Sequence, residues 1–458
     1  MQPTTFILFG GTGDLTKRKL LPAFATLLRE EKLARRSLLI GIGRRPLTHE
    51  SYRDSLFEGL SEDDQKTLQH LSILYFQDDV SQSTGLNNLP QFLQAQEQAA
   101  SNRIYYLATS YTLFPQIVQA LHRTHLDKHT DRWTRLVFEK PFGHDLASSN
   151  ALDNAIHAVF PEEHIFRIDH YLAKETVQNL QVVKFTNPVI DNLLHRALVS
   201  HITLTVDESL GVGNRLGYYA EAGVLKDMIQ NHLLQMTALL LMEQPKTLTN
   251  GALHTAKVEV LTHLQIAPAE QHLLGQYQSY KEECVQANVL YTETATFAKI
   301  ALTCDLPRWK NVPILLRTGK KLPKKYGQLI VHFKPLSASP YPEQRLAENQ
   351  LIIDVYPEQD IRLRLNTRKP WTNMLAPINL LFSPKAHFGP NTSDEYATLL
   401  GDVLRGEKML FTRSDEVQAA WKIVEQIEAL KSKIPFVIYE DETDPEKNSS
   451  RTTGHRFA

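Results

Sequence analysis

The feature that most constrains the fold is a glycine-rich turn between a short apolar strand and a helix. Thr5 to Phe9 is the apolar run, and a helical pattern extends from Leu15 to about Arg29. Glycines in such a turn let backbone N–H groups approach a pyrophosphate at the helix N-terminus, although turn geometry alone can also require them. The spacing departs from GxGxxG because Thr16 stands in the third glycine's place. The turn comprises Gly10, Gly11, Thr12, Gly13, Asp14 and Leu15.

Strand and helix signals alternate through the first third of the chain. Further apolar strand patterns occur at Ser37 to Gly43, Arg103 to Thr109 and Arg135 to Phe138, with helical stretches between them. Short buried strands separated by helices are typical of a parallel, doubly wound sheet. We therefore predict an α/β Rossmann-like dinucleotide-binding domain over residues 1–175.

The pattern changes after about residue 175. Helical patterns lie near 224–242 and 414–431, and several strand patterns alternate in polarity, as in an antiparallel sheet that is wet on one face. These strands are Ser200 to Val206, Gln328 to Phe333, Leu351 to Val355 and Ile361 to Leu365. We predict an α+β domain with a large, mainly antiparallel sheet over residues 176–458. The polar tail after Tyr439 is expected to be mobile.

Composition excludes several classes of protein. The 50 Lys and Arg nearly balance the 51 Asp and Glu, for a net charge of −1, so no global field favours nucleic acid or an anionic membrane. The two cysteines, Cys284 and Cys304, form no CxxC pair, and no metal site is predicted. The start lacks a signal-peptide pattern, and no apolar stretch has the length of a membrane span. We expect a cytoplasmic protein without nucleic-acid or membrane partners.

Arg44 and Arg45 follow the second strand. A dinucleotide-binding domain that prefers NAD commonly has Asp or Glu near this position, whereas arginine accommodates the 2′-phosphate of NADP. A solvated basic loop is the alternative.

Two further motifs carry polar groups that suit an anionic ligand. Lys140 follows the fourth strand pattern and can donate a hydrogen bond to substrate or cofactor. From spacing alone, however, a plain turn with an exposed lysine is the more frequent reason for such a residue. The peptide bond between Lys140 and Pro141 can be cis or trans. If a helix begins at His170, then His170 and Lys174 share one face and suit a phosphate. Glu175 could instead make an ordinary surface ion pair.

A helix from about Val224 carries His232 on a largely apolar stripe. Such a histidine is more often structural than catalytic, but a carboxylate partner would suit it to general-base chemistry. At α-helical spacing Asp227 lies well round the helix, so a partner is expected from elsewhere. A basic run from Arg317 to Lys325 is either a solvated loop or an anion site.

Together these motifs resemble the glucose-6-phosphate dehydrogenase family. The resemblance rests on FGGTGDLTKRKLLPA, EKPFG, RIDHYLAKETVQNL, DMIQNHLLQM, LRTGKKL and TRSDEVQAAW, in the family's order from Phe9 to Trp421. It implies oxidation of β-D-glucose 6-phosphate at C1 to 6-phospho-D-glucono-1,5-lactone with hydride transfer to NADP, the first step of the oxidative pentose phosphate pathway. It also implies a homodimer or homotetramer with the second domain's sheet at the contact.

The resemblance also implies roles for individual residues. His232 would be the general base, oriented by Asp169 as in a catalytic triad without its serine. The residues implied to bind substrate are Lys140, His170, Tyr171, Lys174, Glu208, Asp227, Lys320 and Lys325. The residues implied to bind the cofactor are Gly10, Gly11, Thr12, Gly13, Asp14, Leu15, Arg44, Asp79, Val80, Tyr106 and Lys140.

The sequence departs from the family at three places. Gly11 replaces a residue that is usually alanine, which we expect to be harmless, and Ala173 replaces a glycine, which a helix favours. The segment after Ile438 lacks the family's usual Gly-Ser-Trp-Gly-Pro stretch, so the chain's end is expected to differ.

Two other classes of function compete with this one. A catalytically silent sugar-phosphate or nucleotide sensor on the same fold would have lost the base or its partner, but Asp169 and His232 are both present. An ATP-dependent phosphotransferase needs GxxxxGK[ST], which GGTGDLTK does not match.

Overall fold

The computed structural model describes residues 2–97, 101–128, 131–389 and 394–449. The chain forms two compact units, residues 1–173 with 392–418 and residues 174–391 with 419–458. Within the described part of the chain, no helix combines the length and apolar character that a membrane crossing requires.

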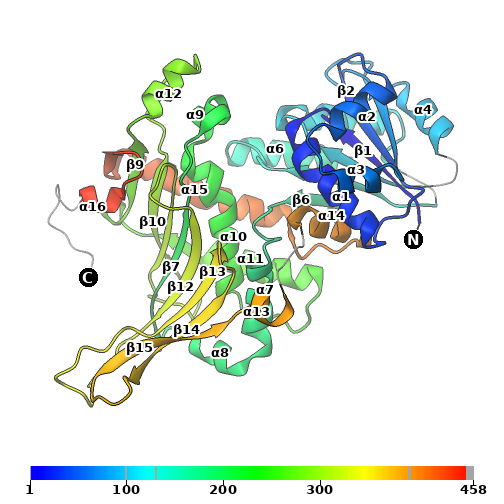
Figure 1. Cartoon of the computed structure of the whole chain (residues 1–458). Coiled ribbons are helices and arrows are strands. Elements are labelled where there is room, and N and C mark those ends of the chain that lie inside the picture. Colours follow the sequence, from blue (N-terminus) through cyan, green and yellow to red (C-terminus); the bar gives the residue numbers. More distant parts are fainter. Residues whose placement is uncertain (1, 98–100, 129–130, 390–393, 450–458) are drawn as a thin grey trace. The chain divides into compact units, whose positions relative to one another are not determined.

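The first unit is built on a seven-stranded sheet in the order β16-β6-β5-β4-β1-β2-β3 (Figure 1). Every neighbouring pair is parallel except β16 with β6. This agrees with the predicted Rossmann-like fold, because β1 lies at the centre and the chain winds outward on both sides. The strands are β1 (Thr4–Phe9), β2 (Leu38–Gly43), β3 (Ser72–Gln77), β4 (Asn102–Leu107), β5 (Thr134–Glu139), β6 (Ile165–Ile168) and β16 (Phe411–Thr412).

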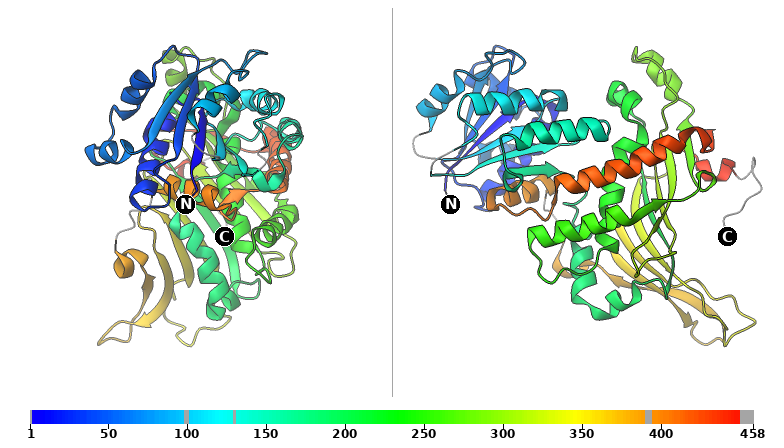
Figure 2. Two further views of the ribbon diagram at one scale, coloured as in Figure 1. Left: turned by 90° about the vertical axis from the view of Figure 1, so that its right-hand side faces the viewer. Right: turned by 180° about the vertical axis from the view of Figure 1, so that it is seen from behind.

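Helices cover both faces of this sheet (Figure 2). The strands β1, β2, β4 and β5 are buried along most of their length, as the near-continuous apolar runs of β1 and β2 require, whereas β3 at the end of the sheet is more exposed. The helices are η1 (Thr16–Leu20), α1 (Leu21–Arg29), α2 (His49–Phe57), α3 (Glu62–Leu68), α4 (Leu89–Gln96), η2 (Tyr111–Leu113), α5 (Phe114–Arg123), α6 (Leu146–His157), η3 (Glu162–His164) and α14 (Glu395–Arg405).

A segment from late in the sequence completes the first unit, which the sequence analysis did not predict. Strand β16 pairs with β6, and Phe411 packs edge-on against Phe166 with ring centroids 4.9 Å apart. Beside this pair, Arg167 is buried and binds Asp153 at 2.7 Å and Glu162 at 2.8 Å. The returning segment therefore shares the core of a domain whose other residues lie more than 200 positions earlier.

The second unit contains a ten-stranded sheet in the order β15-β14-β13-β12-β7-β11-β10-β9-β17, with β8 paired to β10. Only β7 with β11 and β17 with β9 are parallel, so the predicted mainly antiparallel sheet is confirmed. The strands are β7 (Val199–Asp207), β8 (Leu264–Ile266), β9 (Leu273–Tyr277), β10 (Phe297–Cys304), β11 (Ile314–Gly319), β12 (Tyr326–Phe333), β13 (Gln350–Tyr356), β14 (Ile361–Arg368), β15 (Leu375–Phe382) and β17 (Phe436–Tyr439).

Helices α10 and α11 run along one face of the large sheet (Figures 1 and 2). Alternation along β7 and β12 buries every second side chain beneath this layer and leaves the others half-exposed. The helices are α7 (Glu175–Thr186), α8 (Pro188–Leu193), η4 (Gly213–Arg215), α9 (Leu216–Val224), η5 (Leu225–Leu233), α10 (Leu234–Leu241), α11 (Asn250–His263), η6 (Ala269–Gln271), α12 (Tyr280–Gln286), α13 (Pro384–Phe388), α15 (Ser414–Leu430, which begins in the first unit), η7 (Lys431–Lys433) and α16 (Pro445–Ser449).

The expectation of a mobile tail is wrong for residues 440–449. This segment ends in α16, and its carboxylates form ion pairs with the large sheet. Arg317 on β11 binds Asp444 at 3.0 Å and Glu446 at 2.7 Å, and Lys321 binds Asp441 at 3.2 Å. The acidic residues that suggested a solvated tail therefore form ion pairs with basic side chains that the fold brings close to them. Residues 450–458 lie outside the described part of the chain.

We predict that Arg167→Ala lowers the free energy of unfolding by about 3–5 kcal/mol, since removing one partner of a buried ion pair leaves the other charge uncompensated. Urea denaturation of the purified protein measures the change. Lys66→Ala is the matched control, because Lys66 and Glu62 form an exposed helical pair at 3.9 Å, and such pairs contribute less than about 1 kcal/mol. Equal destabilisation by the two substitutions would contradict the role given to Arg167.

Candidate active site

A pocket of about 290 Å³ lies at the carboxyl ends of the parallel strands in the first unit. Ligands of doubly wound sheets bind at this edge, where the strand order reverses. The strands β1, β2, β3 and β4 all end near it. The lining residues are Phe9, Gly10, Thr12, Ile42, Gly43, Arg44, Asp78, Asp79, Val80, Ser81, Thr109 and Leu113.

Close backbone packing explains the glycines of the turn. Gly10 has φ +80°, and a Cβ there would lie 2.4 Å from the carbonyl oxygen of Ala108. A Cβ on Gly11 would lie 2.6 Å from the Cα of Gly41, and the Tyr52 hydroxyl, which donates to the Gly11 carbonyl at 3.0 Å, would lie 2.7 Å from it. Glycine at position 11 is therefore required in this chain, because Gly41 and Tyr52 occupy the space that the methyl group of an alanine would need.

The two arginines after β2 have different surroundings. Arg44 lines the pocket, while Arg45 is not among the lining residues and its carbonyl accepts a hydrogen bond from the Tyr75 hydroxyl at 2.8 Å. Across the pocket, Ser81 donates to Asp79 through its hydroxyl and its N–H, and these bonds lower the pKa of Asp79. The pocket is thus lined by one guanidinium, from Arg44, and by two carboxylates, from Asp78 and Asp79.

The predicted cofactor residues divide between the pocket wall and its surroundings. Gly10, Thr12, Arg44, Asp79 and Val80 line the pocket; Gly11, Gly13, Asp14, Leu15, Tyr106 and Lys140 do not. Gly43, Asp78, Ser81 and Thr109 also line the pocket and were not predicted. Of these, Gly43 ends a recognisable strand and could have been found from its position.

A half-buried carboxylate, that of Glu139, precedes Lys140. The Tyr106 hydroxyl donates to Glu139 at 2.7 Å, and the Tyr396 hydroxyl, from the returning segment, donates to it at 3.1 Å. Burial raises the pKa of Glu139, although both tyrosine hydroxyls oppose the rise. The Lys140–Pro141 bond is cis, which settles an alternative that the sequence left open. Tyr106 is fully buried and its hydroxyl is engaged with Glu139.

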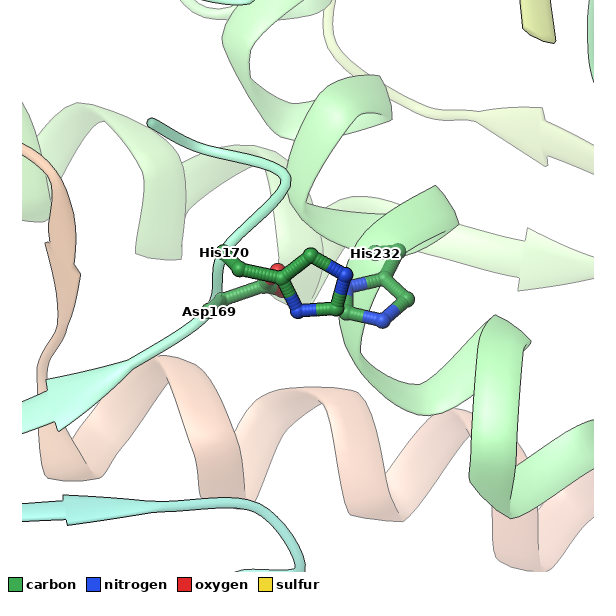
Figure 3. Close-up of side chains that lie close together, drawn as sticks. All are labelled: Asp169, His170 and His232. Carbon is green, nitrogen blue, oxygen red and sulfur yellow. The ribbon is translucent and has the colours of Figure 1, made fainter. Parts of the chain in front are cut away.

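The segment around His170 is a turn, so the conditional prediction of a helix starting there is wrong. Helix α7 begins at Glu175, and Lys174 is its N-cap with extended backbone angles. Asp169 is buried and accepts the N–H of Tyr171 at 3.0 Å, which tightens the turn directly after β6. Figure 3 shows Asp169 and His170 on this turn and His232 on its helix.

His232 lies on a π-helix instead of an α-helix. The π-helical segment η5 covers Leu225–Leu233, and π-helical hydrogen bonds join residues five apart. Asp227 and His232 have this spacing, so the α-helical argument that placed Asp227 well round the helix does not hold. Asp227, Gln230, Asn231 and His232 are all buried, a concentration of polar groups that needs a functional or structural reason.

One edge of the large sheet gathers residues from four strands. Asp207 at the end of β7 pairs with Gly319 at the end of β11 and with Tyr326 at the start of β12. Beyond this row, Lys320 forms an ion pair with Glu208 and lies 3.6 Å from Asp227. The structure therefore brings together three residues that the resemblance assigned to substrate binding.

The same edge holds two further predicted lysines around one ring. Lys174 and Lys325 have their Nζ atoms 5.6 and 5.7 Å from the ring centroid of Tyr356, which ends β13. The Nζ atom of Lys320 similarly lies 5.4 Å from the ring centroid of Tyr219. Burial, and then the charge of Asp227, raise the pKa of Tyr219 far above its usual value. No sequence pattern singled out either tyrosine, because only strand register and helix position place them here.

The basic run divides between internal ion pairs and this edge. Arg317 binds Asp207 at 3.1 Å, and burial raises the pKa of Asp207 to about 6 even though the guanidinium opposes it. Lys321 contacts Glu283 at 3.4 Å and Asp441. Neither the solvated-loop interpretation nor the anion-site interpretation covers the whole run: Arg317 and Lys321 are structural, while Lys320 and Lys325 lie among polar site residues.

Comparison with known protein families accounts for both units. Residues 7–179 match the family described as "Glucose-6-phosphate dehydrogenase, NAD binding domain", and residues 181–456 match "Glucose-6-phosphate dehydrogenase, C-terminal domain".

Individual relatives match over nine-tenths or more of their length. A protein named glucose-6-phosphate 1-dehydrogenase from Chlamydia muridarum is 34% identical, over 94% of this chain and 91% of the relative. One from Mycolicibacterium smegmatis is 36% identical, over 93% and 90%. A solved structure described as glucose-6-phosphate dehydrogenase in complex with its substrate glucose-6-phosphate is 26% identical, with a TM-score of 0.89 over 100% of this chain and 99% of that one. These matches confirm the resemblance, and the chain belongs to the glucose-6-phosphate dehydrogenase family of oxidoreductases.

Proposed function

We propose that the protein oxidises β-D-glucose 6-phosphate at C1 to 6-phospho-D-glucono-1,5-lactone, with NADP as the hydride acceptor. The observation that carries the proposal is the buried polar π-helix: a histidine in the position of the family's base lies almost fully buried beside buried amides and Asp227. Burying such groups is costly unless bound partners or hydrogen bonds compensate. The presence of both His232 and Asp169 favours an enzyme over a silent sensor.

His232 would remove the proton from the C1 hydroxyl as hydride leaves C1. Asp169 would orient the imidazole and stabilise its charged form. When bound, the nicotinamide ring supplies the hydride acceptor. Because the proton and the hydride leave the same CHOH group, the base needs only to accept one proton and release it to solvent.

The polar edge of the large sheet suits a sugar phosphate. The Lys320 ammonium lies between the carboxylates of Glu208 and Asp227, so the three side chains offer both the acceptors and the donors that hydroxyl groups require. Lys174 and Lys325 supply positive charge for the phosphate, and His170 and Tyr171 would complete its site. Lys140 would contact substrate and cofactor together.

The glycine-lined pocket suits the adenosine end of a dinucleotide. The N–H groups of Gly10 and Gly11 donate to the Ile42 carbonyl at 3.1 and 3.2 Å, which fixes the turn. The Gly13 N–H donates to the Gly10 carbonyl at 2.9 Å, so the pyrophosphate would be held by other amides of the turn, such as that of Thr12, and by those at the start of the helix, where the first N–H groups have no intrahelical acceptor. Arg44 at the end of β2 would bind the 2′-phosphate, which favours NADP over NAD.

We predict that His232→Asn lowers kcat by about 10²–10⁴-fold, the range for loss of a general base, while the Kd for glucose 6-phosphate changes little. Absorbance of the reduced cofactor gives kcat, and calorimetry gives Kd. His263→Asn, which alters an exposed histidine on α11, is the control and should leave both unchanged. Wild-type-like turnover of His232→Asn would remove His232 from this role.

We predict that Arg44→Ala raises the KM for NADP by about 10–100-fold, since a hydrogen bond to a charged group contributes about 1.5–3 kcal/mol. The KM for NAD should change much less. Arg45→Ala is the matched control, because Arg45 does not line the pocket and its loss should have a smaller effect. Steady-state kinetics with each cofactor decides between them, and equal effects of Arg44→Ala on NADP and NAD would reject the assignment.

We also propose a homodimer, or a homotetramer of paired dimers, with the large sheet at the contact. Strand β15 exposes a run of apolar side chains, and contiguous exposed apolar surface is typical of interaction sites. Ile378, Leu380, Leu381 and Phe382 are each between 46% and 56% exposed. Sedimentation equilibrium should give a multiple of 52.2 kDa, and Leu381→Glu should shift it towards the monomer. A monomer at micromolar concentration would contradict the proposal.

A further inference from the structure

Two histidines and a glutamate from three segments meet on the half-exposed face of the large sheet. His201 on β7 pairs directly with His332 on β12, so their side chains project from the same face. His332 pairs in turn with Gln350 on β13, and Glu348 lies two residues before Gln350, which returns it to that face. The cluster lies at the opposite end of β7 from Glu208, away from the groups assigned to the sugar.

The side chains of this cluster are close and held by neighbours. The two imidazole rings stack with centroids 3.9 Å apart and planes 15° apart. Nδ1 of His332 lies 2.8 Å from a carboxylate oxygen of Glu348, and one potential ligand atom from each of the three residues lies within 4.8 Å of the others. Gln350 donates to Glu348 at 3.1 Å, which holds the carboxylate towards the rings.

We propose that His201, His332 and Glu348 form a binding site for a divalent transition-metal ion of the zinc type. Imidazole nitrogens and a carboxylate oxygen are ligands that Zn²⁺, Co²⁺ and Ni²⁺ accept readily. Two histidines and one glutamate are also a ligand set that leaves a fourth position for water. No residue of the cluster belongs to the proposed catalytic or cofactor sites.

The geometry needs only side-chain rotation to become a metal site. Ligands at about 2.0–2.2 Å around a tetrahedral ion lie about 3.3 Å from one another. The present 2.8 Å contact between His332 and Glu348 must open slightly, and His201 must turn out of its stack. The backbone pairing of β7, β12 and β13 already sets the positions from which these side chains extend, so no strand has to move.

The charges of the cluster favour a cation. Burial, and then the neighbouring His332, lower the pKa of His201. Burial disfavours the charged form of Glu348, but the hydrogen bond from His332 and its charge outweigh this and lower the pKa of Glu348. A metal ion binds neutral imidazoles and ionised carboxylates, so a bound ion would replace the proton that joins His332 to Glu348.

An access route adjoins the cluster. Glu348 lines an open cavity of about 790 Å³ between residues 334–349 and the strands β14 and β15. A hydrated ion can therefore reach the carboxylate from solvent, and water can occupy the fourth position. Ser200 and Thr203 hydroxyls lie 3.2 Å from nitrogens of His201 and His332 respectively, and such hydrogen bonds orient ligand rings.

The test is a titration of the purified full-length protein with Co²⁺, followed by its visible absorption, and competition with Zn²⁺. The wild-type protein should bind one Co²⁺ per chain that is lost in His201→Asn and in His332→Asn. Glu348→Gln should weaken binding at least about tenfold, since it keeps the shape but removes the charge. Zn²⁺ should also raise the Tm of the wild-type protein but not of the histidine variants.

Controls separate this site from other histidines. The chain has 18 histidines, and His263→Asn removes an exposed one outside the cluster, so it should titrate like the wild-type protein. All variants should keep their dehydrogenase activity without added metal, which also shows that they are folded. Identical Co²⁺ titrations of the wild-type protein and both histidine variants, or no wild-type binding below 1 mM Co²⁺, would overturn the proposal.

Discussion

The pairing of β7 with its two neighbours is the constraint on which much of the second unit depends. β7 runs parallel to β11 and antiparallel to β12, so one register row contains Asp207, Gly319 and Tyr326. That row brings Glu208, Lys320 and Lys325 to one edge of the sheet. The same antiparallel pairing sets His201 against His332 near the other end of the strand. A register shift of one residue would move every side chain of β7 to the opposite face of the sheet and separate the residues of both groups, the one around Lys320 and the one around His332.

The first unit depends on parallel pairing in a comparable way. Because β1, β2, β3 and β4 all end at one edge, the glycine turn, Arg44 and Asp79 line a single pocket although up to 70 residues separate them. The returning segment then contributes Tyr396, whose hydroxyl holds Glu139 beside Lys140. A half-buried carboxylate that accepts two hydroxyl hydrogen bonds is held in place, and it fixes the start of the lysine segment that follows it.

The π-helix in the second unit concentrates polar groups where an α-helix would separate them. Its wider turn relates Asp227 to His232, and every polar side chain from Asp227 to His232 is buried. π-helical segments are rare and occur frequently at functional sites. Glycine supports the entry to this helix: Gly223, the next-to-last residue of α9, has φ +60°, a conformation that a side chain would resist, and it interrupts the helix two residues before the π-helix begins.

The sequence alone determined the features that depend on neighbours along the chain. The apolar run before Gly10 and the alternation along residues 200–206 predicted a parallel sheet followed by a mainly antiparallel one, and the family motifs identified the residues to inspect. Local pattern could not show that His232 lies on a π-helix, because residues 224–236 also fit an α-helical stripe. It could not show that the acidic tail folds, since Asp444 and Glu446 find Arg317 only across 127 and 129 residues.

Long-range pairing was decided by the tertiary structure. Strand β16 joins the first sheet from residue 411, and Tyr356 meets Lys174 and Lys325 through strand register. His201 and His332 are 131 positions apart and carry no motif, so nothing in the sequence marked them as neighbours. The physical reason is that hydrogen bonding between strands sets which side chains face each other, and a strand's own sequence records its faces but not its partners.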